Sequence, residues 1–345
     1  MPPARIPAST YRLQFNREFG FEKARALVPY LHALGITDIY ASPLLAARRG
    51  SPHGYDVTDP TRINPELGGE EGMRSLAAFL REHGMGLLLD VVPNHMAASP
   101  ENPWWFDLLR WGPDSPYAGY FDLDWQPARP SLAGKVLLPI LGSPYNEALE
   151  KGELTITLTG KGFGVACHDW WLPLNPPSHG QILEYLGAEG ELKRLANVFA
   201  GQPGREEFFR AVKELWRLYT QNSGLRAWIN ESLQLINGQK GKPRNLAFLD
   251  ELLSRQHYRL AFWRLANEEI NYRRFFDVTG LVSLRMEDEE VFEATHSLVL
   301  RLAHEELITG FRIDHVDGLH DPRGYLQRLQ ECLLPGVTKA GLCYA

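Results

Sequence analysis

The sequence predicts an α/β fold in which strands and helices alternate as in a β/α barrel, with a long insertion after the third strand. Three observations support this prediction. Strand-like and helix-like segments alternate through residues 1–95, the alternation stops over 96–287, and it resumes over 288–345. Alternation of this kind is typical of parallel strands joined by right-handed helical crossovers.

The first 95 residues contain three predicted strands and two predicted helices. The first helix ends before Gly35, although Pro29 within it would kink it unless the helix begins there. The third strand is a continuous apolar run, which is typical of a strand buried on both faces. In chain order the elements are a strand over 10–15, a helix over 21–34, a strand over 36–41, a helix over 73–80 and a strand over 86–92.

The segment 96–287 is predicted to be irregular, aromatic and rich in proline and glycine, with one strand over 154–158 and helices over 208–219 and 225–236. Six of the nine tryptophans lie between 104 and 171, and we expect most of them to form the core of this segment rather than a sugar platform. After it follow a helix over 291–302, a strand over 309–316 and a helix over 323–333. Residues 341–345 are predicted to open a fifth strand.

Composition excludes several classes of function. A net charge of −6 over 345 residues argues against nucleic acid or an anionic membrane as the main partner. No apolar run approaches the roughly 18 residues that a membrane-spanning helix needs. Three cysteines, no His-x-His pair and no secretory signal predict a cytoplasmic protein with neither a metal nor another cofactor.

Polar residues cluster where the predicted strands end. In β/α barrels the loops at the carboxyl ends of the strands carry the catalytic groups. Period two places Arg312 and Asp314 on one strand face, so the cation would keep the carboxylate ionised. The candidates are His53, Tyr55 and Asp56 after the second strand, Asp90 and His95 at the third, and Arg312, Asp314 and His315 at the fourth.

Two of these motifs resemble known signatures. The patterns Asp90-x-x-x-Asn94-His95 and Gly310-x-Arg312-x-Asp314 are similar to the first two signature regions of the α-amylase superfamily. Four further stretches, 9–15, 51–57, 271–276 and 314–319, are similar to the maltooligosyltrehalose synthase family. The resemblance implies a (β/α)8 TIM barrel of α-amylase type. Residues 1–95 would hold its first three strands, 96–287 an inserted domain, and 288–345 the fourth β/α unit and the start of strand five.

The resemblance also implies a role for each candidate. Asp314 matches the nucleophile that forms a covalent glycosyl-enzyme, and Arg312 matches the arginine that orients it. The remaining candidates would contact a maltooligosaccharide: Asp90 and His95 at the cleavage point, Tyr55 by stacking on the sugar, Asp56 by holding its loop, His53 in the same loop, and His315 on the acceptor side.

The implied reaction is an isomerisation, in which the reducing-end α-1,4 bond of a maltooligosaccharide is rejoined as α,α-1,1. A retaining mechanism needs a second carboxyl as general acid, and the only glutamate after Asp314 is Glu331 on the last predicted helix. We therefore expect an N-terminal portion that is inactive alone. Two alternatives stay open, namely an α-1,4-glucan hydrolase of the same superfamily and a non-catalytic glucan-binding protein.

Overall fold

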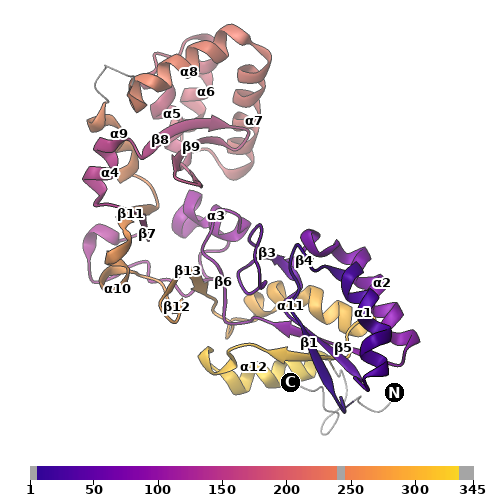
Figure 1. The fold of residues 1–345 in the computed structure, drawn as a ribbon. Helices are drawn as coiled ribbons and strands as arrows, with labels where there is room; N and C mark the ends of the chain where they lie inside the picture. Colours follow the sequence, from indigo (N-terminus) through magenta and orange to yellow (C-terminus); the bar gives the residue numbers. More distant parts are fainter. Residues whose placement is uncertain (1–5, 239–244, 334–345) are drawn as a thin grey trace. The chain divides into compact units, whose positions relative to one another are not determined.

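The computed structural model describes residues 6–238 and 245–333, so the predicted start of strand five at 341–345 lies outside the described residues (Figure 1). The chain divides into two compact units. Unit 1 consists of residues 1–103, 119–122 and 273–345, and unit 2 of 104–118 and 123–272. The expected insertion, 96–287, is thus longer than unit 2, because both of its ends belong to unit 1.

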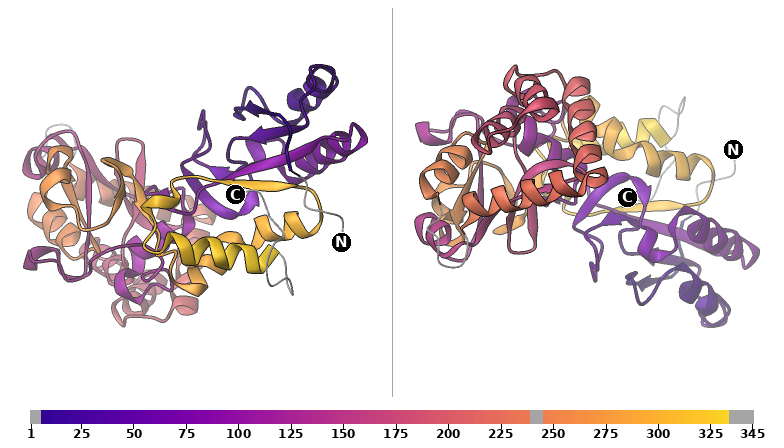
Figure 2. Two further views of the ribbon diagram at one scale, coloured as in Figure 1. Left: turned by 90° about the horizontal axis from the view of Figure 1, so that it is seen from below. Right: turned by 90° about the horizontal axis from the view of Figure 1, so that it is seen from above.

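Unit 1 is built on a parallel four-stranded sheet with the order β1-β2-β5-β14. Its helices flank the strands as the alternating pattern predicts, and Figure 2 gives two further views of them. Helices α2 and α11 contact each other, since Arg301 pairs with Glu70 (2.8 Å). The strands are β1 (Thr10–Leu13), β2 (Asp38–Ala41), β5 (Gly86–Val91) and β14 (Gly310–Ile313); the helices are α1 (Phe21–Ala33), α2 (Gly69–Glu82), α11 (Glu289–His304) and α12 (Pro322–Leu333).

The predicted elements of unit 1 are confirmed, although most of their ends differ by one to four residues from the predicted ones. Helix α1 runs through Pro29 and begins eight residues before it, at Phe21. The fourth strand ends at Ile313 and not at Val316, because His315 adopts a left-handed conformation (φ 53°) and Val316–Gly318 then form a short 3-10 helix, η5. Asp314, His315 and Asp317 therefore lie after the end of the strand, in the segment that leads to α12.

Helix α11 fixes the position of β14. The Asp288 side chain caps its first turn by accepting a hydrogen bond from the Glu290 amide (3.0 Å). Acidic residues at its start and Arg301 and His304 in its last turn complement the helix dipole. Its buried face, which includes Phe292, Leu298 and Val299, packs into the core and brings the chain back to pair with β5.

Two small antiparallel sheets complete unit 1, and neither was predicted. One pairs β3 (Leu45–Ala47) with β4 (Val57–Ile63), and the short helix η1 (Pro65–Leu67) follows β4. The other has the order β12-β13-β6, with β12 (Arg274–Phe275), β13 (Val278–Ser283) and β6 (His95–Ala97). This second sheet joins the segment that follows β5 to residues 274–283, which were expected in the insertion.

Unit 2 is more regular than predicted. Strand β7 (Val136–Leu141) pairs in parallel with β11 (Tyr258–Phe262), and β8 (Leu154–Thr159), β9 (Gly162–Cys167) and β10 (Trp170–Pro173) form an antiparallel sheet. Figure 1 shows α7 and α8 beside this sheet. The helices are α3 (Pro103–Trp111), α4 (Tyr145–Lys151), α5 (Pro176–Tyr185), α6 (Gly190–Ala200), α7 (Arg205–Gln221), α8 (Ser223–Asn237), α9 (Leu246–Ser254) and α10 (Ala266–Glu269); three short 3-10 helices lie at Gly112–Asp114, Pro130–Leu132 and Trp263–Leu265.

Within unit 2, the predicted strand over 154–158 and the helices over 208–219 and 225–236 are confirmed by β8, α7 and α8. The expectation that the segment is otherwise irregular is wrong. Most of its other elements are too short to display a repeating pattern. In the described part of the chain, no helix combines the length and apolar character that crossing a membrane demands.

Candidate active site

The candidate site forms where β5 and β14 end side by side. The two strands are parallel, and Arg312 lies in register with Asp90. The pairing continues past the strand ends, since the Asp314 amide donates to the Val91 carbonyl (2.8 Å). The carboxyl ends of neighbouring strands thus bring two carboxylates and a guanidinium together.

The Asp90 side chain is completely buried and is held by three donors. Its Oδ2 accepts hydrogen bonds from the hydroxyls of Tyr40 (2.7 Å) and Tyr55 (2.6 Å), and its Oδ1 accepts one from Arg312 Nη1 (3.0 Å). Burial raises the pKa of Asp90, and the three donors act against that shift. Burial and the bond to Asp90 raise the pKa of Tyr55, so its hydroxyl keeps the hydrogen that it donates.

Asp314 is more open than Asp90, with 15% of its side chain exposed. Its Oδ1 accepts a short hydrogen bond from Arg312 Nη1. Although partial burial alone would lower it, contact with Asp314 and Asp90 raises the pKa of Arg312. A permanently charged guanidinium therefore lies between the two carboxylates, and the Asp314 oxygen that does not face Arg312 is left available for chemistry.

His95 lies against this cluster, buried and neutral. Only 1% of the residue is exposed, and burial lowers the pKa of His95 to about 4, although the nearby Asp314 carboxylate acts in the opposite direction. Its ring packs on Phe275 (4.4 Å between centroids), and the Asn94 side-chain amide lies 3.3 Å from Nδ1. A backbone hydrogen bond with Tyr55 also acts to raise the pKa of the ring. By distance and angle Nε2 has no hydrogen-bond partner among the described residues, so it is positioned to bind a polar group of a ligand.

The loop after β3 that carries Tyr55 is held by Asp56 and by Gly54. Asp56 Oδ1 accepts from the Ser51 hydroxyl (2.5 Å), which in turn accepts from the Gly54 amide (3.1 Å). Gly54 has φ of 81°, and a Cβ there would lie 2.6 Å from the Pro43 carbonyl oxygen, so only glycine fits. His53 sits at the exposed tip of the same loop, with Nδ1 3.8 Å from Asp56.

His315 lies in the loop after β14. Its ring contacts those of Phe275 (4.9 Å) and Phe276 (5.1 Å), so Phe275 contacts both His315 and His95. Its Nδ1 is 3.5 Å from Asp317 Oδ1. The structure thus places all eight predicted site residues in unit 1, with Asp90, Arg312 and Asp314 in direct contact.

The sequence interpretation missed several residues that contact these groups. Tyr40 was used only as part of a strand pattern, yet its hydroxyl binds Asp90. Arg12, on β1, donates to the Tyr55 hydroxyl (3.2 Å) and stacks over the Tyr40 ring. Arg273 and Phe275 were expected in the insertion. Each of Tyr40 and Arg12 lies near a strand end, which is the signal that would have identified them.

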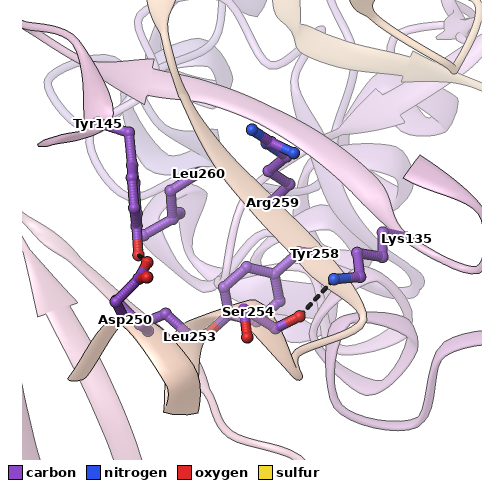
Figure 3. Close-up of a pocket in the computed structure, with 8 residues that line it drawn as sticks. All are labelled: Lys135, Tyr145, Asp250, Leu253, Ser254, Tyr258, Arg259 and Leu260. Atoms are coloured by element: carbon purple, nitrogen blue, oxygen red, sulfur yellow. Dashed lines mark hydrogen bonds between the residues drawn. The ribbon is translucent and has the colours of Figure 1, made fainter. Parts of the chain in front are cut away.

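A separate cavity of about 150 Å³ lies wholly within unit 2 (Figure 3). Tyr145 donates to Asp250 (2.9 Å) on one side of it, and Lys135 donates to the Ser254 carbonyl on another. The remaining lining residues are Leu253, Tyr258, Arg259 and Leu260.

Within residues 6–238 and 245–333, no group of three or more His, Cys, Asp or Glu side chains is arranged to hold a metal ion.

Comparison with known proteins gives consistent matches. The family model for the α-amylase catalytic domain matches residues 26–146. A putative maltooligosyl trehalose synthase of Mycobacterium tuberculosis is 37% identical over 336 residues, which is 95% of this chain and 34% of that protein. The resemblance inferred from the motifs is confirmed.

Solved structures agree with these sequence matches. The DSM5389 glycosyltrehalose synthase superposes with a TM-score of 0.70 at 31% identity, covering 94% of this chain and 35% of that one. The maltooligosyltrehalose synthase of Arthrobacter ramosus gives a TM-score of 0.67 at 34% identity, covering 95% and 33%. The fold is of the α/β TIM-barrel type. The chain spans about a third of the length of the relatives it matches.

Proposed function

We propose that the chain contributes to intramolecular transglucosylation of maltooligosaccharides, forming an α,α-1,1 linkage at the reducing end. The observation that carries this proposal is the contact of Asp90, Arg312 and Asp314 at the ends of two parallel strands, in a chain similar to maltooligosyl trehalose synthases. The proposed substrate is therefore an α-1,4-glucan oligosaccharide.

In this proposal Asp314 is the nucleophile. Its carboxylate attacks the anomeric carbon next to the terminal α-1,4 bond, a glycosyl ester forms, and the bond to the reducing glucose breaks as its O4 takes a proton from the general acid. The released glucose then turns in the site. Its anomeric hydroxyl displaces Asp314 and gives its proton back to the same group, which restores both carboxyls to their starting states. Arg312 donates to Asp314 and places a positive charge beside it, because a guanidinium stays charged at all accessible pH values.

The other residues would bind the sugar whose bond is broken. Tyr55 presents a half-buried ring with its hydroxyl fixed on Asp90, a geometry suited to stacking on the C–H face of a pyranose. His95 offers an unpartnered Nε2, and Phe275 contacts the rings of both His95 and His315. We assign His315 to the acceptor side and His53 to the rim, because its side chain is 46% exposed.

The proposal extends to the architecture. Strands β1, β2, β5 and β14 are assigned as the first four strands of a (β/α)8 barrel, with unit 2 inserted after the third of these, β5. The general acid of the retaining reaction is assigned to none of the described residues, since Glu331 lies on helix α12.

A donor with a good leaving group tests the nucleophile separately from the acid. Fluoride leaves without protonation, so α-maltosyl fluoride should glycosylate Asp314 even where no general acid is present. Mass spectrometry of peptides would locate the added glycosyl group, and the Asp314→Asn variant is the control. Labelling at another carboxylate, or none in a folded protein that binds maltoheptaose, would contradict the assignment.

Counting reducing ends separates the three candidate functions. With maltopentaose, transglucosylation lowers the number of reducing ends, while the alternative, hydrolysis, raises it. A protein that binds maltoheptaose by calorimetry but leaves both the count and the fluoride donor unchanged would instead be a non-catalytic glucan-binding protein.

A further inference from the structure

We propose that Arg273 fixes the tautomer of His95 through the side-chain amide of Asn94, so that Nε2 carries the hydrogen and faces the site as a donor. Arg273 belongs to the 271–276 stretch, which is similar to the maltooligosyltrehalose synthase family, but that similarity implied no role for this arginine. The inference concerns a positioning residue, since Arg273 acts on His95 only through Asn94.

Arg273 is the centre of a network that joins four segments of unit 1. Its Nη1 donates both to Asn94 Oδ1 (3.0 Å) and to the Gly318 carbonyl (2.8 Å). Its Nε donates to Asp122 Oδ2 (2.7 Å), and its Nη2 donates to the Leu284 carbonyl (3.3 Å). Bonds on three sides of the planar guanidinium leave it little freedom to turn.

A fixed guanidinium decides how the Asn94 amide lies. Arginine has only donors, so the amide atom that faces Nη1 must be the oxygen. The Asn94 NH₂ group then faces His95, with its nitrogen 3.3 Å from Nδ1. Rotating the amide by half a turn would set its NH₂ group against the donors of Arg273, which costs the hydrogen bond to a charged group.

The orientation of the amide in turn decides the state of the imidazole. An NH₂ group donates, so Nδ1 must accept and cannot carry a hydrogen. Because burial lowers the pKa of His95 to about 4, the ring is neutral at pH 7 and keeps one hydrogen, which must then be on Nε2. This nitrogen is the one without a partner among the described residues.

Gly318, which follows β14, contributes its carbonyl to the hydrogen-bond network of Arg273. A Cβ at this position would lie 3.1 Å from Asn94 Oδ1 and 2.3 Å from the His315 ring. The absence of a side chain lets the loop after β14 approach Asn94 and offer its carbonyl to Arg273. The loops that follow β5 and β14 therefore both bind Arg273. The tautomer of His95 thus depends on the position of the loop that carries His315.

The consequence for binding rests on the proposed function. A ring or glycosidic oxygen of a sugar can only accept hydrogen bonds, so it can pair with Nε2–H and not with a bare nitrogen lone pair. In the opposite tautomer Nε2 would accept, and it would select hydroxyl donors instead. Arg273 would thus determine which oxygens of the glucan His95 recognises without touching the glucan.

Nitrogen-15 NMR of the histidine side chains tests the inference directly. At about pH 8, above the ordinary histidine pKa, His95 should show a protonated Nε2 and a bare Nδ1. In Arg273→Met the amide loses its fixed orientation, and signals of the Nδ1–H tautomer should appear. Arg273→Lys keeps one donor toward Asn94 and should restore most of the original spectrum.

Two more variants complete the design. Asn94→Asp preserves the pairing with Arg273 but can only accept from the ring, so it should invert the tautomer even if Arg273→Met fails to fold. Arg274→Met is the matched control, because the side chain of Arg274 donates to the Asp277 carbonyl. An unchanged Nε2–H tautomer in folded Asn94→Asp would overturn the inference, as would an Arg274→Met spectrum that changes like that of Arg273→Met.

Binding measurements keep this inference distinct from the proposed function. By calorimetry, Arg273→Met should weaken maltoheptaose binding about tenfold, equivalent to one hydrogen bond, and Arg273→Lys should recover most of it. If the tautomer changes as expected but no variant, nor the unmodified protein, binds maltoheptaose, the proposed function fails and the role of Arg273 stands.

Discussion

Two carboxylates, Asp90 and Asp314, share one arginine in this molecule, but they differ in burial and in the number of their hydrogen-bond partners. Asp90 is completely enclosed and is held by two tyrosine hydroxyls as well as Arg312. Asp314 contacts the same guanidinium but is 15% exposed, and no other hydrogen-bond partner is found for its side chain in the described part of the chain.

The difference shows how the surroundings of a carboxylate decide whether it can react with a substrate. Every oxygen of Asp90 is occupied, so its charge can organise neighbours but cannot attack a substrate. Asp314 keeps one oxygen free while the other pairs with the guanidinium of Arg312, an arrangement that suits a nucleophile.

The largest expected effect follows from replacing the two carboxylates separately. Asp90→Asn leaves two tyrosine hydroxyls and a guanidinium facing a neutral amide and should lower the free energy of unfolding by about 3–4 kcal/mol. Asp314→Asn should lower it by about 1 kcal/mol or less, because the pair it forms with Arg312 is partly solvated. Urea denaturation measures both values. Equal losses for the two variants would show that enclosure does not distinguish the carboxylates.

The sequence predicted the sheet of unit 1 because its strands and helices are long enough to show their periods. Residues 86–92 are apolar apart from Asp90, and Gly86–Val91 is indeed buried at every position. The same reasoning placed Asp90, Arg312 and Asp314 together, since parallel neighbouring strands end at one edge.

The remainder depends on contacts between distant residues that no local pattern reveals. Arg273 lies 179 positions from Asn94, and only the folded chain shows that its side chain binds there. The short strands β12 and β6 have two and three residues, too few for an alternating pattern, and so the return of 273–287 to unit 1 was missed. Tyr40 could have been picked out by its place near a strand end, but its partner, Asp90, is evident only in the folded chain.

The pH dependence of stability tests the burial of His95, which lies against the Asp90 cluster. Its folded pKa of about 4 lies below the ordinary 6.5, so between these values the unfolded chain binds a proton that the folded one excludes. Stability is therefore lost as the pH falls from 6.5 to 4, by roughly 3 kcal/mol for this residue.

Unfolding titrations at several pH values compare the unmodified protein with His95→Gln. The variant should lose less stability on acidification, although the buried His179 and His296, whose pKa values burial lowers to about 3 and about 4, keep part of the effect. Replacing the exposed His53 in the same way is the control. An unchanged acid sensitivity in His95→Gln would place that ring in contact with water.

A double-mutant cycle sharpens the account of how Asp90 is held. Tyr40→Phe and Tyr55→Phe each remove one donor to the same oxygen, Oδ2, and each should cost about 1–2 kcal/mol of unfolding free energy. Together they should cost less or more than the sum, because residues in one network couple. Strict additivity would mean that the two hydroxyls act independently. Since Phe keeps the ring, Tyr55→Phe should still bind maltoheptaose, whereas Tyr55→Ala should not.

The smallest expected effect concerns Asp56, a third carboxylate, which is held by a neutral donor instead of an arginine. Ser51→Ala removes the hydroxyl that binds Asp56 Oδ1 and accepts from the Gly54 amide, and it should lower the free energy of unfolding by about 1 kcal/mol. The same variant should loosen the loop that carries Tyr55, which amide hydrogen exchange at Gly54 would detect. If the Gly54 amide exchanges faster while the contacts of Asp90 stay intact, the loop moves independently of the Asp90 cluster. Unchanged exchange would instead assign its rigidity to Gly54 and Pro43, where the backbone leaves no room for a side chain.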